Sequence, residues 1–222
     1  MPRDLADSGL GVNRDKTERF SISQNCDETW KDTIVIGSKL DTQRDISRRK
    51  QLASAAWSKY GNLLLNKKLP LLLRVKYFDA YVSSIFLHQC GLWPITKELG
   101  KHVNAFQNNF LRRIVGIKYP KRITNVELHN ITNQKPWSEV CKQRRLSLFG
   151  HTCRLPSEAP ARKAIEEAIR KVPKLAGGQR KTLISLIAED LKTVNTTIEE
   201  AISLAQDKNN YNGLVHRAMS RD

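Results

Sequence analysis

Apolar residues recur every three or four positions from residue 44 onward, which is the spacing of amphipathic helices. After Pro70, for example, Leu71, Val75, Phe78 and Val82 fall on one helical face. The pattern predicts about eight helices. They cover residues 44–66, 70–86, 96–114, a short stretch from 124, 136–149, 161–171, 182–192 and 198–206, with a last short helix at 211–219.

Start and stop signals support these boundaries. Thr96 is placed to cap the helix that follows it, and Thr124 with Glu127 three residues later has the capping-box pattern. Pro70 suits the first turn of a helix. Breaks are expected at Gly91 with Pro94, at residues 116–120, at Gly150 with Pro156 and Pro160, and at residues 173–178.

The first 43 residues have a different pattern. Alternation over residues 20–22 and the β-branched run 33–36, which ends at Gly37, each predict a short strand. Two strands alone make a marginal ribbon in water, so they would need a sheet from elsewhere. The predicted fold class is therefore mainly α, with a short β-hairpin followed by many helices.

Charge is the strongest signal of the whole chain. The 222 residues include 38 Lys and Arg against 22 Asp and Glu, a formal net charge of +16. Such a surplus makes a compact domain repel itself, and a polyanion relieves that repulsion while releasing condensed counterions. Nucleic acid is thus the expected partner. A membrane surface is the rival, but we find no lipidation motif, and the most apolar stretch, 63–73, is short and charged, so no membrane partner is expected.

The sequence does not predict a metal site or a complete catalytic site. Cys26, Cys90, Cys141 and Cys153 include no pair at CxxC spacing, so we expect reduced structural thiols in an intracellular compartment. The chain lacks the motifs G-x-S-x-G, H-E-x-x-H and a P-loop. It also has no Asp-Asp pair of the kind that holds two metal ions for phosphoryl transfer.

Basic side chains cluster close to several predicted helices, where they suit phosphate contacts. The residues expected to bind nucleic acid are Arg48, Arg49, Lys50, Lys67, Lys68, Arg112, Arg113, Lys121, Arg122, Lys142, Arg144 and Arg145. Aromatic residues accompany them and have two readings, as core residues or as platforms for bases. We favour the core for these six, which are Trp57, Tyr60, Tyr77, Tyr81, Trp93 and Trp137.

Several strings occur in the order of a known family. They are Gly9-Leu10-Gly11-Val12-Asn13 with Lys16-Thr17-Glu18, Val35-Ile36-Gly37-Ser38-Lys39-Leu40, Arg48-Arg49-Lys50, Leu111-Arg112-Arg113-Ile114, Arg144-Arg145-Leu146, Phe149-Gly150-His151, Arg154-Leu155-Pro156, Gly177-Gly178-Gln179, Glu189-Asp190-Leu191, Glu199-Glu200-Ala201 and Leu204-Ala205-Gln206-Asp207. In this order the chain resembles the end of a non-LTR (LINE-type) retrotransposon endonuclease–reverse transcriptase, from the segment after the catalytic Asp-Asp hairpin to the C-terminal tail. The fingers, the endonuclease and the Asp-Asp hairpin of that family have no counterpart in this chain. Ile36 stands where an aromatic-containing run is common in the family.

The resemblance implies an organisation and a set of roles. Residues 1–43 would be a palm remnant with a primer-grip-like segment, 44–118 a thumb-like helical domain, 119–172 a basic helical connector and 173–222 a C-terminal helical tail. Lys16 would lie near nucleotide phosphates, although a solvated lysine is an equal alternative. Gly37, Ser38, Lys39 and Leu40 would support the primer end, and Gly37 would allow a close approach of the backbone.

The resulting hypothesis is a fragment of an RNA-directed DNA polymerase that binds RNA or an RNA–DNA hybrid and is catalytically incomplete on its own. No cofactor is expected in this fragment, whereas the complete enzyme would need Mg²⁺. The missing polymerase domains are a further possible partner, and the nucleus or the cytoplasm is the expected location. A non-enzymatic helical module that binds nucleic acid or protein, and a decayed gene product, are the alternatives.

Overall fold

The computed structural model describes residues 31–170 and 181–219. The chain divides into two compact units, Met1–Arg48 and Arg49–Asp222, each of which is described by itself. Within the described residues the protein is mainly helical with one short antiparallel hairpin, so the predicted fold class is confirmed. The predicted strand at 20–22 and the predicted break at 173–178 lie outside the described ranges.

The first unit contains the hairpin and the start of a long helix. Strand β1 (Ile34–Val35) pairs with β2 (Ser38–Lys39), with Ile34 opposite Lys39 and Val35 opposite Ser38. Ile36 and Gly37 form the turn with positive φ values of 49° and 80°. The run at 33–36 is predicted as a strand, and its partner is the segment immediately after Gly37. Helix α2 (Thr42–Leu64) then begins in this unit and continues into the second.

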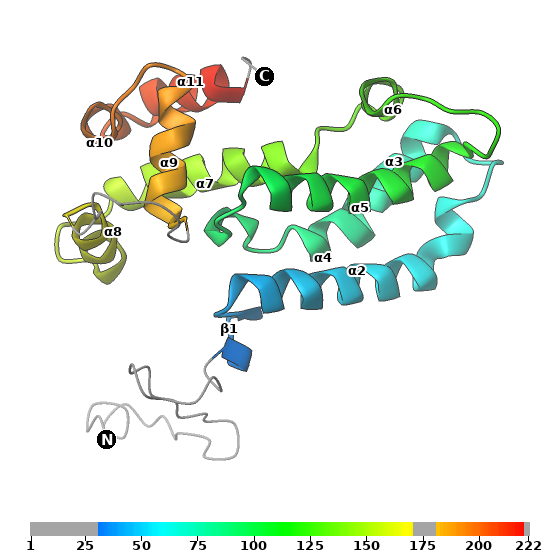
Figure 1. Cartoon of the computed structure of the whole chain (residues 1–222), viewed down its shortest axis with the longest axis horizontal. Helices are drawn as coiled ribbons and strands as arrows, with labels where there is room; N and C mark the ends of the chain where they lie inside the picture. Colours follow the sequence, from blue (N-terminus) through cyan, green and yellow to red (C-terminus); the bar gives the residue numbers. More distant parts are fainter. Residues whose placement is uncertain (1–30, 171–180, 220–222) are drawn as a thin grey trace. The chain divides into compact units, whose positions relative to one another are not determined.

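The second unit is built from helices close to those predicted. After α2 come α3 (Leu71–Phe78), the π-helix η3 (Asp79–Ser83), α4 (Ser84–Phe86), the 3-10 helix η4 (Cys90–Leu92), α5 (Lys97–Val115), α6 (Asn125–Thr132), α7 (Trp137–Cys153), α8 (Pro160–Arg170), α9 (Leu183–Lys192), α10 (Ile198–Ala205) and α11 (Lys208–Met219). Figure 1 shows α5 and α7 among the helices that follow α2, with α9, α10 and α11 near the far end of α7.

The predicted caps form. The Thr96 side chain accepts a hydrogen bond from the Leu99 amide at the start of α5. Thr124 and Glu127 make a reciprocal capping box on α6. A further capping box, which was not predicted, joins Thr182 and Ser185 on α9. Each cap satisfies amide groups that the first turn of a helix leaves without an intrahelical partner.

One predicted break is wrong. Gly150 is expected from the sequence to end a helix, but α7 runs through it to Cys153. Gly150 is buried inside the helix, and a Cβ atom there would lie 2.2 Å from Cε1 of Tyr211 on α11. The glycine therefore admits a neighbouring ring, and it does not mark a turn.

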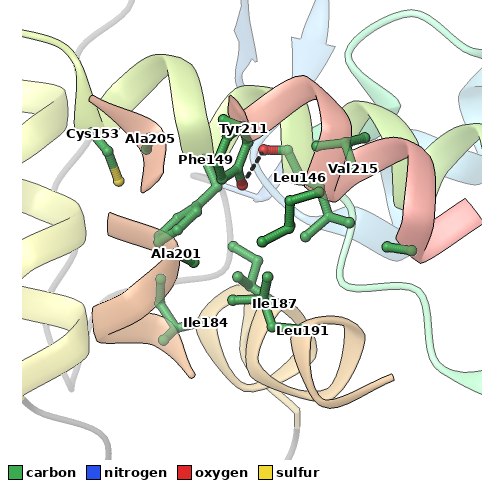
Figure 2. Packing of buried hydrophobic residues seen from close by; sticks show 12 residues of the cluster. Leu146, Phe149, Cys153, Ile184, Ile187, Leu191, Ala201, Ala205, Tyr211 and Val215 are labelled. Carbon is green, nitrogen blue, oxygen red and sulfur yellow. Dashed lines mark hydrogen bonds between the residues drawn. The ribbon is translucent and has the colours of Figure 1, made fainter. Parts of the chain in front are cut away.

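The C-terminal helices close around α7 with a core of their own. It includes Leu146, Phe149, Ile187, Leu191, Tyr211 and Val215, all buried (Figure 2). The Tyr211 hydroxyl donates to the Leu146 carbonyl oxygen at 2.9 Å. Because the phenol has this partner, its burial leaves no polar group unsatisfied.

A second apolar centre joins α2, α3, α4, α5 and α7. Phe78 and Phe86 each stack on Trp137, with ring centroids 5.9 Å and 4.4 Å apart. Trp57 from α2 stacks on Phe110 of α5 at 4.7 Å. These rings fix the helices that carry the basic side chains.

Candidate nucleic-acid interface

The positive charge is unevenly distributed along the helical unit. Residues 49–154 include 19 Lys and Arg against 4 Asp and Glu. The described C-terminal stretch 181–219 includes 4 Lys and Arg against 5 Asp and Glu. A polyanion would therefore be attracted to the helices before α8.

Two connections bring seven of these cations to one end of the helical unit, which we call the basic end. It consists of Lys67, Lys68, Arg112, Arg113, Lys118, Lys121 and Arg122. The α2–α3 and α5–α6 connections lie at the same end of the unit (Figure 1). Lys67 Cε lies 3.8 Å from the position that a Cβ of Gly116 would take. Arg74 of α3 also donates a hydrogen bond to the Ile114 carbonyl oxygen of α5. The α2–α3 and α5–α6 connections, which carry most of these charges, are therefore neighbours.

The basic end lacks neutralising carboxylates in its own segments. Neither residues 59–76 nor residues 112–126 include an Asp or a Glu. Lys67, Lys68, Lys118, Lys121 and Arg122 are exposed, and within the described ranges their side chains have no hydrogen-bond or ion-pair partner. Such side chains are free to contact phosphate groups of a ligand.

Other predicted cations at this end have intramolecular partners as well. The Arg112 guanidinium donates to Asn125 Oδ1 at 2.6 Å, which ties α5 to the start of α6. The Arg113 guanidinium lies 4.7 Å from the ring centroid of Trp57. Arg113 is exposed, so its charge remains available at the surface despite this contact.

Three of the predicted arginines hold the fold together. Arg49 is buried, and its Nη2 lies 2.7 Å from His88 Nδ1. Arg144 Nη1 donates to the Leu87 carbonyl oxygen at 2.6 Å. Arg145 is buried and donates to Asp190 Oδ2 through Nε at 2.9 Å and Nη2 at 2.5 Å. Each guanidinium makes contacts within the helical unit that a phosphate contact would disturb.

Lys50 and Lys142 also have neighbours within the protein. Lys50 Nζ lies 5.8 Å from the ring centroid of Phe106. Lys142 is buried, with 9 % of its surface exposed. Lys142 and Arg145 line a cavity of about 690 Å³ between α5, α7 and α9. The other cationic residues that line this cavity are Lys97, Lys101, Lys181 and Lys192, and the acidic ones are Glu139, Glu189 and Asp190. The sequence pattern did not reveal this cavity because its walls come from three separate segments.

The primer-grip-like residues lie in the hairpin unit. Gly37 is in the turn, Ser38 and Lys39 form β2, and Leu40 follows with 41 % exposure. Arg48 Nη1 donates to the Gly37 carbonyl oxygen at 2.9 Å.

Within the same unit, Asp32 gathers two cations. Lys39 Nζ lies 2.6 Å from Asp32 Oδ1, and Arg44 pairs with the other carboxylate oxygen. The hydrogen bond from Lys39, with the nearby Arg44 charge, lowers the pKa of the Asp32 carboxyl. Lys39 is therefore partly neutralised within its own unit. Lys16, the predicted nucleotide-phosphate residue, lies outside the described residues.

The six aromatic residues separate into two groups. Trp57, Trp93 and Trp137 are buried at 5 %, 3 % and 1 % exposure, in agreement with the predicted core role. Tyr60 and Tyr77 are partly buried and Tyr81 is exposed, and the first two each stack on Tyr81 at the surface of α2, α3 and η3. For these three the core assignment is incomplete.

Residues 31–170 and 181–219 contain neither a candidate metal cluster nor a helix suited to span a membrane. No cluster of His, Cys, Asp and Glu suited to a metal ion occurs in those ranges. Cys90, Cys141 and Cys153 are buried free thiols there. None of the helices described has both the length and the apolar character needed to cross a bilayer.

Comparison with known proteins gave no relative. No family model, curated protein or solved structure matches this chain.

Proposed function

We propose that this chain binds the phosphate backbone of RNA or an RNA–DNA hybrid at the basic end, as the palm-end, thumb and tail portion of a non-LTR reverse transcriptase. The observation that carries the proposal is the meeting of two acid-free loops that carry five exposed cations with no partner within the described ranges. On its own the chain would be catalytically incomplete, because its sequence contains no Asp-Asp pair to match the catalytic pair of that family.

Electrostatics explains why a nucleic acid fits this surface. Lys and Arg that neutralise phosphates release condensed counterions, and this release drives binding without reading sequence. The apolar contacts of Trp57, Phe78, Phe110 and Trp137 hold the helices below the basic end in place. The cations are thus presented on a packed scaffold, and only their own side chains must be ordered on binding.

The test compares matched pairs of lysine and arginine substitutions. We expect K67S/K68S and K121S/R122S to weaken binding of a fluorescent RNA–DNA hybrid in anisotropy titrations. The slope of log K against log salt should become shallower by about 0.9 for each duplex phosphate that the variant no longer neutralises. The control K208S/R217S removes two exposed cations of α11, in the charge-balanced C-terminal stretch, and should leave both quantities unchanged.

Two outcomes would overturn the proposal. Binding that is insensitive to salt, or equal losses of affinity in the control and the loop variants, would contradict a phosphate interface at the basic end. Template-dependent DNA synthesis by the purified chain with Mg²⁺ would contradict the statement that it is catalytically incomplete.

A second candidate is a non-enzymatic helical module with a protein partner. Exposed apolar side chains on α6 favour it, since Val126 is 70 % and Ile131 46 % exposed. Salt separates the two proposals, because an apolar protein contact would change little between low and moderate salt whereas phosphate binding would fall steeply.

A further inference from the structure

Three tyrosines form a ladder on the surface of the helical unit. The rings of Tyr60 from α2 and Tyr81 from η3 have centroids 4.3 Å apart and planes 20° apart. Tyr77 from α3 continues the series, with its centroid 6.3 Å from that of Tyr81 and a plane angle of 25°. Tyr81 is therefore stacked with both of the other rings, and the three residues come from the segments on either side of the α2–α3 connection.

Core packing does not account for this arrangement. Tyr81 is 38 % exposed, and Tyr60 and Tyr77 are half-buried, whereas the tryptophans of the same unit are buried. Parallel aromatic rings at a surface offer flat π-faces and edges to further rings. A nucleobase is a flat aromatic ring of this kind, and stacking on tyrosine tolerates any base.

The charges around the ladder also suit a nucleic acid. Lys59 Nζ lies 5.4 Å from the Tyr60 ring centroid, and Lys76 is exposed beside Tyr77 in the sequence. The nearest acidic residue in the sequence is Asp79, and its carboxylate accepts hydrogen bonds from Ser83 Oγ at 3.2 Å and Gln134 Nε2 at 2.9 Å. The basic end begins at Lys67 and Lys68, on the connection between the segments that carry the ladder.

We propose that the tyrosine ladder takes unpaired bases of a single-stranded segment of RNA or DNA, while the basic end holds its phosphates. This inference rests on the proposed function and specifies the form of the ligand. A single strand is required because the bases of a duplex are stacked on their neighbours and do not offer their faces to a protein.

Cross-linking tests the contact directly. A single-stranded oligonucleotide of about 12 nucleotides that contains 5-iodouracil at each position in turn is irradiated with the full chain, and the adducts are mapped by mass spectrometry. We expect adducts at Tyr60, Tyr77 or Tyr81. Adducts confined to Tyr119, which is 86 % exposed between Lys118 and Lys121, would overturn the proposal by placing the bases in the α5–α6 connection.

Substitutions give an independent readout. We expect Tyr81→Leu, which keeps an apolar side chain but removes the ring, to weaken single-strand binding about 5- to 150-fold with an unchanged salt slope. Tyr81→Phe should retain most of the affinity, and duplex binding should be unchanged in both variants. Equal single-strand affinities for the wild type and Tyr81→Leu would overturn the ladder proposal.

The same titrations separate the two proposals. If K67S/K68S reduces the salt slope while Tyr81→Leu has no effect, the phosphate interface stands and the ladder does not. If neither variant matters, both fail. RNA and DNA oligonucleotides of equal length are compared, and a preference for one identifies which single strand the site takes.

Discussion

The ring of Tyr211 occupies the space that a side chain at Gly150 would need. A Cβ atom at position 150 would lie 2.2 Å from Cε1 and 2.4 Å from Cδ1 of Tyr211. The tyrosine has little freedom to withdraw, because it is 1 % exposed and its hydroxyl donates to the Leu146 carbonyl oxygen at 2.9 Å. Residues 61 positions apart in the sequence thus depend on each other at the α7–α11 contact.

Gly150→Ala should therefore destabilise the C-terminal core. We expect a decrease of about 1–3 kcal/mol in the free energy of unfolding, since overpacking a closed core costs this much and outweighs the helix propensity gained. Urea denaturation followed by circular dichroism measures the change.

The control for this prediction is Gly213→Ala on α11, where a Cβ would meet nothing within 4 Å. It should stabilise the protein by about 0.5–1 kcal/mol, because alanine favours the helix. A gain of stability in both variants would mean that Tyr211 moves away without cost.

The pair formed by Arg145 and Asp190 leads to a second prediction. Their side chains are 5 % and 14 % exposed, and Arg145 also donates to the Trp93 carbonyl oxygen at 3.4 Å. Arg145→Met should cost about 3–5 kcal/mol, because it leaves a largely buried carboxylate without its cation.

Replacing both partners should recover much of that stability. In R145M/D190L the hydrogen-bonded pair is removed as a unit and only Lys142 loses the nearby Asp190 charge; apolar replacements of buried pairs are often tolerated. Thermal and urea unfolding measure both variants, with K163M as the control because its partner Glu158 is exposed and the pair should contribute no measurable stability. A double variant as unstable as R145M alone would refute this account.

Asp79 gives a pH-dependent prediction. Burial raises the pKa of its carboxyl above the usual 3.8, and hydrogen bonds from Gln134 and Ser83 offset only part of this effect. A carboxyl with a raised pKa binds its proton more tightly in the folded state than in the unfolded state. The contribution of Asp79 to stability therefore decreases as the pH rises from 3.8 through the folded-state pKa.

The measurement is a series of urea titrations at different pH, made on the wild type and Asp79→Asn. The free energy of unfolding of the wild type minus that of Asp79→Asn should fall as the pH rises through that window and then level off. A difference that increases with pH would show that hydrogen bonding to the ionised form outweighs burial.

Local signals in the sequence predicted most of the helices. The features that these signals missed depend on residues that are far apart in the sequence. Thr96 and Thr124 cap helices as predicted, because the interacting amide lies three residues away, within reach of a sequence pattern. The predicted break at Gly150 is wrong because its partner, Tyr211, is far along the chain.

The same limit applies to the candidate site. Arg145 and Lys121 look equally available in the sequence, yet the first is buried against Asp190 and the second is exposed. Nothing near Arg145 in the sequence indicates its partner 45 residues later. The meeting of the α2–α3 and α5–α6 connections likewise depends on the packing of α3 on α5.

These two classes of cation lead to the last prediction. Lys121→Ser with Arg122→Ser should change the free energy of unfolding by no more than about 0.5 kcal/mol, because both side chains are exposed, while it weakens nucleic-acid binding. Arg49→Met should instead lower stability and leave nucleic-acid binding by the folded protein unchanged. It removes a buried guanidinium that contacts His88 and the Ile85 carbonyl oxygen, so the free energy of unfolding should fall. The protein that remains folded should bind nucleic acid with the same salt slope as the wild type. Anisotropy titrations well below the unfolding midpoint, paired with urea denaturation, measure both quantities on each variant. A shallower salt slope for Arg49→Met at unchanged stability would show that this arginine leaves its internal partners to contact phosphate.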